Sequence, residues 1–208
     1  NTASCCFSLV VGGSANTASK TYSVILGGKT NNNCGTFSTL VGGLSNTIDQ
    51  DCATVTGGAF NRASGAFSTL GGGRFNCASG TYATVGAGSF NSGSGVCSTI
   101  AGGRLNVASG DSSTVAGGFS GTAAGDFTVV GGCKNRARGN FSAIIGGHSS
   151  IVCTAHTGSS VIGTEINTVS ADMLHARTLF LSAAQLPTTD PGVAGVVWRD
   201  GTDLKISI

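Results

Sequence analysis

Residues 67–81 read Phe67-Ser-Thr-Leu-Gly-Gly-Gly-Arg-Phe-Asn-Cys-Ala-Ser-Gly-Thr81, and variants of this stretch recur along most of the chain. With the copies aligned on the last glycine of each glycine-rich stretch, seven consecutive intervals are fifteen residues long, and later ones are fourteen, fifteen and sixteen. A unit this short cannot bury its own apolar side and must stack on its neighbours. The repeat therefore predicts an all-β fold, a parallel β-solenoid or β-roll of ~15-residue coils. The aligned glycines are Gly13, Gly28, Gly43, Gly58, Gly73, Gly88, Gly103, Gly118, Gly132, Gly147 and Gly163.

Each aligned position of the repeat has its own chemistry. β-branched and aromatic residues favour strands and glycine permits a corner, so each copy predicts one short strand before the glycine and a second one near Asn76-Cys-Ala-Ser79. Stacked about 4.8 Å apart, the copies would form ladders of like residues. These columns are aromatic (Phe7, Tyr22, Phe37, Cys52, Phe67, Tyr82, Cys97, Ser112, Phe141), aliphatic (Val10, Ile25, Leu40, Val55, Leu70, Val85, Ile100, Val115, Ile144), asparagine (Asn16, Asn31, Asn46, Asn61, Asn76, Asn91, Asn106, Asn135) and threonine (Thr39, Thr54, Thr69, Thr84, Thr99, Thr114).

The spacing of the aromatic and aliphatic columns predicts self-association. They lie three positions apart, so side chains that alternate along a strand place them on opposite sides of the sheet. A single solenoid would bury one column and expose the other along its whole length, which symmetric association would cover. We therefore expect a homo-oligomer, a trimer in its simplest form. The core and interface candidates are Phe37, Phe67, Tyr82, Leu40, Leu70, Val85 and Ile100.

The repeat quoted above resembles the head repeats of trimeric autotransporter adhesins over residues 1–167. That resemblance implies a left-handed parallel β-roll, trimerisation along its axis and a function in attachment. The repeat of this family is typically one residue shorter than the repeat in this chain. Similar arrays also occur in viral and phage fibres.

The C-terminal stretch from Leu186 to Ser207 resembles the terminal segment of many phage and large-DNA-virus structural proteins, including tail fibres. Asp200-Gly201 suits a tight turn, and apolar and polar residues alternate over 203–208, so a β-hairpin is predicted. The expected organisation is a β-roll over 1–167, a neck over 168–186 and a hairpin cap over 187–208. Within the neck, Ser170–Arg177 is predicted as one short helix and 178–182 as a strand.

Charge and motif content point away from catalysis and nucleic-acid binding. Only 10% of the residues are charged and the formal net charge is +2, so no polyanionic nucleic acid is expected as a partner. No apolar run is long enough to span a bilayer, and we expect no membrane insertion. Asp and Glu never recur in register and the three histidines share no metal spacing, so we expect no enzyme activity, no metal and no cofactor.

Two further features concern contacts. Lys134, Arg136 and Arg138 alternate along one stretch and would share a face, either as a solvated edge or as a contact for acidic surface glycans. The eight cysteines contain no Cys-x-x-Cys motif and are scattered over several columns, so we interpret most as small buried hydrophobic residues. Stapling of chains across a three-fold axis is the alternative.

The leading functional hypothesis is a structural fibre or adhesion protein, a viral or phage tail-fibre component that contacts a host receptor or surface glycan. It would be located on a virion, at a cell surface or outside the cell. A cellular adhesin of the autotransporter type is the first alternative. An ice-binding solenoid is the second, because the threonine column runs through six consecutive coils.

Overall fold

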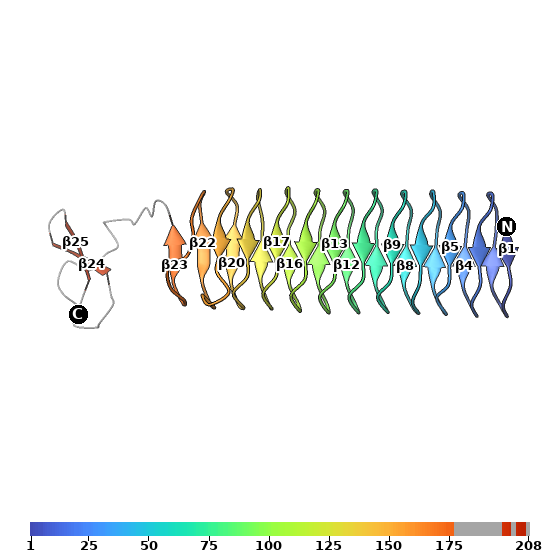
Figure 1. Cartoon of the computed structure of the whole chain (residues 1–208), viewed down its shortest axis with the longest axis horizontal. Helices are drawn as coiled ribbons and strands as arrows, with labels where there is room; N and C mark the ends of the chain where they lie inside the picture. The colour runs from blue at the N-terminus through green and yellow to red at the C-terminus, as the bar shows by residue number, and fades with distance from the viewer. Residues whose placement is uncertain (177–196, 201–202, 207–208) are drawn as a thin grey trace. The chain divides into compact units, whose positions relative to one another are not determined.

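The computed structural model describes residues 1–176, 197–200 and 203–206, and the chain divides into two units, residues 1–177 and 178–208. The first unit is a parallel β-solenoid whose coils stack along one axis (Figure 1). From β1 to β22 each coil contributes one two- or three-residue strand to each of two sheets, β23 extends one of the sheets, and the described residues contain no helix. The predicted fold class is confirmed.

The two sheets of the roll contain eleven and twelve strands. The 11-stranded sheet consists of β1 (Thr2–Ala3), β3 (Thr17–Ala18), β5 (Asn32–Asn33), β7 (Thr47–Ile48), β9 (Arg62–Ala63), β11 (Cys77–Ala78), β13 (Ser92–Gly93), β15 (Val107–Ala108), β17 (Thr122–Ala123), β19 (Arg136–Ala137) and β21 (Ile151–Val152). The 12-stranded sheet consists of β2 (Leu9–Val10), β4 (Val24–Ile25), β6 (Thr39–Leu40), β8 (Thr54–Val55), β10 (Thr69–Leu70), β12 (Thr84–Val85), β14 (Thr99–Ile100), β16 (Thr114–Val115), β18 (Val129–Val130), β20 (Ala143–Ile145), β22 (Ser160–Ile162) and β23 (Leu174–Ala176).

Like residues pair with like residues between coils. Thr69 of β10 lies beside Thr84 of β12, and Leu70 lies beside Val85, both in parallel register. A third column of isolated parallel bridges runs along the glycine corner from Ser14 to His148. The in-register stacking expected from the repeat is therefore present in both strand columns.

Each coil consists of two similar half-turns. In each half-turn a residue with left-handed backbone is followed by an inward polar residue, an outward strand residue and an inward apolar strand residue. Phe67 (φ 58°), Ser68, Thr69 and Leu70 form one half-turn, and the second begins at Phe75 (φ 55°). The left-handed residue supplies the bend that starts each short strand, at a steric cost for a non-glycine residue of roughly 1–2 kcal/mol.

The core is a column of aliphatic and alanine side chains between the two sheets. Leu70 from the 12-stranded sheet and Ala78 from the 11-stranded sheet are both fully buried, as are their counterparts in neighbouring coils. Burial of such residues removes apolar surface from water, at about 25 cal/mol per Å². The core therefore extends through the coils of the roll.

Buried asparagines close the glycine corner. The Nδ2 of Asn76 donates to the carbonyl of Gly72 in its own coil and to that of Gly88 in the next coil, both at 2.9 Å. Its Oδ1 accepts the backbone N–H of Asn91 at 2.9 Å. One side chain thus pairs three backbone groups; the Gly72 carbonyl and the Asn91 N–H have no other partner among the described residues, whereas the Gly88 carbonyl also accepts the N–H of Arg74.

The roll extends beyond the residues expected from the repeat. Strand β23 pairs with β22, and the backbone N–H of Asp172 donates to Thr157 at 2.9 Å. Residues 168–176, expected to begin a neck, thus belong to the last coil, while 177–186 lie outside the described residues. The helix predicted over 170–177 is wrong, because Leu174–Ala176 gains hydrogen-bond partners by extending the exposed edge of the 12-stranded sheet.

The second unit contains an antiparallel pair. Strand β24 (Val197–Asp200) pairs with β25 (Asp203–Ile206), and Asp200 lies opposite Asp203. This matches the predicted C-terminal hairpin. The strand predicted over 178–182 lies outside the described residues.

Candidate interaction surfaces

The structure divides the seven core and interface candidates into two groups. Leu40, Leu70, Val85 and Ile100 have no exposed surface and belong to the core. Phe37, Phe67 and Tyr82 are 62%, 49% and 53% exposed. The aromatic and aliphatic columns therefore do lie on opposite sides, but the left-handed bend at each aromatic residue, rather than a continuous strand, turns its ring outward.

The exposed aromatic rings stack along the roll axis. The centroids of Phe67 and Tyr82 are 4.9 Å apart, and the ring planes differ by 16°. A second stack runs along the other half-turn through Phe60, Phe75 and Phe90. This second aromatic column was not among the predicted ones, although its members recur at the same fifteen-residue spacing.

The outer face of the 12-stranded sheet contains no charged side chain from β2 to β22. Three positions of each coil form this face: the left-handed residue before the strand, the first strand residue and the residue two positions further on. In the coil of β10 these are Phe67, Thr69 and Gly71. None of the equivalent residues is Asp, Glu, Lys, Arg or His. We call this surface the uncharged face; its large exposed hydrophobic residues are Phe7, Leu9, Val11, Tyr22, Leu26, Phe37, Val41, Phe67, Tyr82, Phe127, Val129, Phe141, Ile145 and Ile162.

The outer face of the 11-stranded sheet has a different character. It presents Asp49, Arg62, Lys134 and Arg136, in addition to neutral side chains. Arg62 and Asp49 form an ion pair at 2.5 Å, the one found within the described part of the chain. The hydrogen bond from Arg62 to Asp49 and the negative charge of that carboxylate raise the pKa of the Arg62 guanidinium above its ordinary value. The two sheets therefore present chemically different outer faces.

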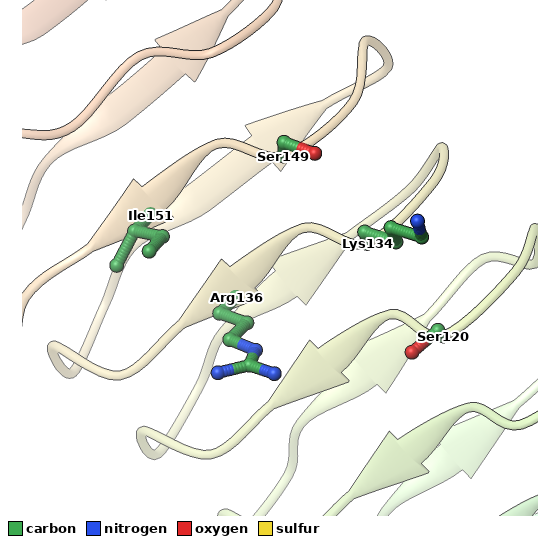
Figure 2. Close-up of a pocket in the computed structure, with 5 residues that line it drawn as sticks. All are labelled: Ser120, Lys134, Arg136, Ser149 and Ile151. Carbon is green, nitrogen blue, oxygen red and sulfur yellow. The ribbon is translucent and has the colours of Figure 1, made fainter.

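The three predicted glycan-contact residues lie together on this charged side. Lys134, Arg136 and Arg138 are exposed and alternate with buried residues, so the structure places them on one face, as their spacing predicts. Figure 2 shows that Lys134 lies between Ser120 and Ser149 of the adjacent coils, while the Arg136 side chain extends toward the preceding coil. Together with Ile151 these residues line an open hollow of about 340 Å³.

This hollow coincides with an irregularity of the repeat. Gly121 occupies the position that asparagine has in most other coils. The interval between the aligned glycines Gly118 and Gly132, which contains it, has fourteen residues instead of fifteen. The backbone N–H of Gly121 still donates to Asn106 at 2.8 Å, but Gly121 has no side chain to continue the ladder. Small side chains at Ser120 and Ser149 leave space beside Lys134 that Phe60, Phe75 and Phe90 fill in their own coils.

The cysteines are not buried, contrary to the expectation from sequence. All eight are free, and each is exposed or partly exposed. They lie at outward positions of the coil or at its corners, where the side chain does not have to fill space in the core. Cys77, for example, is the outward residue of β11, whereas Ala78 is its buried one.

No group of three or more His, Cys, Asp or Glu residues that could hold a metal occurs among the described residues. Nor do the described residues include a helix long and apolar enough to cross a membrane. The chain matches no protein-family model and no curated protein sequence.

Proposed function

We propose that this protein is a structural fibre module that self-associates through its uncharged face and serves in attachment at the surface of a virus particle. The observation that carries the proposal is the absence of charge from this face across the coils of β2 to β22. Fourteen large hydrophobic side chains are exposed on this face, and a monomer rarely exposes a contiguous apolar patch of more than a few hundred Å². A second copy of the chain presents a surface of the same length and composition, so it is the partner that fits best.

Rotation about an axis parallel to the roll would bury the uncharged face of every copy and leave the charged side outside. A cyclic assembly closes without leaving a free uncharged face, and we propose a trimer because the repeats resemble the heads of trimeric adhesins. The resemblance of the repeats to trimeric adhesin heads and of the C-terminal stretch to viral fibre proteins supports the same proposal. An adhesin on a cell surface would use the same architecture.

Light scattering on the purified full chain, with and without reductant, tests the assembly. The expected mass is three times the 20.3 kDa of one chain, and it should not change on reduction, because packing rather than disulfide bonds would hold the copies together. A stable monomer over the micromolar range would contradict the proposal. A trimer that dissociates on reduction would instead favour stapling through the exposed cysteines.

One observation favours ice binding as a second candidate function. Thr39, Thr54, Thr69, Thr84, Thr99 and Thr114 stack in register from β6 to β16 on the uncharged face, partly or fully exposed. A regular hydroxyl array on a flat sheet could order water, but only if this face stays open. The two candidates therefore give opposite results: a monomer with thermal hysteresis supports ice binding, and an oligomer without it supports the fibre.

A further inference from the structure

We infer that Lys134, Arg136 and Arg138 form a binding row for an acidic polysaccharide, one that bears sulfate or carboxylate groups. The inference rests on the attachment role proposed above and names the class of ligand that the charged side would bind. It does not require a particular oligomeric state, because the row lies on the 11-stranded sheet and not on the uncharged face.

The first argument is that these three cations lack carboxylate partners within the described residues. Arg62 occupies the same outward strand position as Arg136, but it is paired with Asp49 at 2.5 Å. Arg74 lies over the Phe75 ring at 4.7 Å and Arg104 near the Phe119 ring at 5.9 Å. The row therefore groups three positive charges on one face without a carboxylate partner among the described residues.

The second argument is the geometry of the row. Lys134 is the left-handed residue before β19, Arg136 is the outward residue of β19 and Arg138 follows the strand, so the three exposed side chains leave the roll at successive points on one face. The side chains do not converge on one point: Figure 2 shows Lys134 and Arg136 extending in different directions. This arrangement suits a chain carrying several separate anionic groups better than a single small anion.

The third argument is the hollow beside the row. Hydroxyl groups of Ser120 and Ser149 can exchange hydrogen bonds with sugar hydroxyls, and Ile151 offers apolar surface to a sugar ring. A duplex nucleic acid fits less well, because its affinity depends on many phosphate contacts and the row supplies three cations. Glu165 lies in the same column as Lys134 but two coils further on, and Asp126 belongs to the preceding coil, where its carboxylate accepts a hydrogen bond from Asn140 at 3.4 Å. Both lie outside the row itself.

The test measures binding of the full chain to dextran sulfate by calorimetry, with uncharged dextran and polygalacturonate as companion probes. We expect binding to dextran sulfate or polygalacturonate that weakens as salt is added, and none to dextran. The stronger of the two acidic probes identifies the anionic group. Absence of binding to both would overturn the inference, as would equal binding to uncharged dextran.

The decisive variant combines Lys134→Ser, Arg136→Thr and Arg138→Ala, which places at each position the residue found one coil earlier, namely Ser120, Thr122 and Ala124. Its affinity should fall about tenfold or more, the combined effect of three exposed ion pairs. The matched control is Arg62→Thr, because Thr47 is the residue at the equivalent position one coil earlier. This variant should leave the affinity for the polysaccharide unchanged.

Two further outcomes separate this inference from the others. If the triple variant binds as tightly as the original chain, or if duplex DNA of matched charge binds equally well, the row is not a polysaccharide site. Light scattering of the triple variant should give the same mass as the original chain. An original chain that is monomeric and still binds the acidic polysaccharide would count against the proposed assembly alone.

Discussion

The Oδ1 of Asn76 accepts the backbone N–H of Asn91, one coil further along, at 2.9 Å. The same relationship links Asn91 to Asn106 at 3.0 Å, and so on along the corner. Because each asparagine also donates to two glycine carbonyls, its side chain connects its own coil to the next one through three backbone groups.

We expect Asn76→Ala to lower the free energy of unfolding by about 3 kcal/mol, since it leaves the N–H of Asn91 and the carbonyl of Gly72 without a partner in a buried corner. Denaturant unfolding followed by circular dichroism measures the loss, and amide exchange at Asn91 locates it. Asn76→Ser should cost less, because Ser150 occupies this column in a later coil and donates to Gly163 at 3.2 Å. Equal stability of Asn76→Ala and the original chain would contradict the role of the ladder.

Adjacent glycines of one corner should differ sharply in their tolerance of alanine. Gly73 has a φ of +81°, and a Cβ there would lie 2.0 Å from the carbonyl oxygen of Gly88. A Cβ on Gly72 meets nothing within 4 Å, and Ala87 occupies the equivalent position in the next coil.

Gly73→Ala should therefore destabilise the roll by roughly 2 kcal/mol or more, because both backbone strain and a backbone clash oppose it. Gly72→Ala is the matched control and should change the free energy of unfolding by less than about 0.5 kcal/mol. A thermal melt of the two variants side by side gives the answer. Similar melting temperatures would mean that the corner can shift to admit a side chain.

Buried serines of one column should respond differently to removal of the hydroxyl. The Ser68 Oγ is buried and has no hydrogen-bond partner among the described residues, and Ala53 and Ala83 occupy the same column. The Ser23 Oγ, by contrast, donates to the carbonyl of Lys20 at 2.6 Å.

Ser68→Ala should raise the free energy of unfolding by up to about 1 kcal/mol, while Ser23→Ala should lower it by about 1 kcal/mol. The comparison uses the same substitution at equivalent positions, so differences in helix or strand preference do not enter. Denaturant titration of both variants is sufficient. A loss of stability in Ser68→Ala would show that its hydroxyl has a partner after all, such as a buried water.

Charge placed on the two outer faces should separate assembly from folding. Thr84 is the outward strand residue of β12 on the uncharged face, and Ser92 is the outward strand residue of β13 on the other sheet. Both are partly exposed, so a lysine at either position can reach water in a single roll.

Thr84→Lys should reduce the mass measured by light scattering to that of one chain, because association would bury the new charge without a partner. Ser92→Lys should leave the mass unchanged. Circular dichroism checks that both variants keep the β-solenoid. Dissociation of both variants, or of neither, would place the interface elsewhere.

The sequence predicted the fold well because the repeat encodes its own stacking. A fifteen-residue period fixes which residues pair, and Thr69 and Thr84 indeed lie side by side. The period does not reveal where the backbone enters the left-handed region, since Phe67 and Phe75 are bulky residues for which that conformation is uncommon. The second aromatic column, by contrast, is visible in the fifteen-residue spacing of Phe60, Phe75 and Phe90.

The candidate surfaces were predictable only in part. The alternation around Lys134 and Arg136 placed them on one face, but the hollow depends on small residues in the coils before and after, which no single stretch displays. The position of the last coil could not be predicted from the repeat, because no glycine pair follows Leu174–Ala176. This segment joins the sheet through backbone hydrogen bonds, which any residue except proline can donate.

Every regular coil makes the same contacts with the coil before it and the coil after it. No strand pairing in the roll connects coils that are not adjacent. Gain or loss of one whole fifteen-residue unit would therefore keep every ladder intact and change the length of the roll by one strand spacing, about 4.8 Å. Duplication or deletion of one repeat can thus change the length of the molecule in fixed steps without altering either end of the roll.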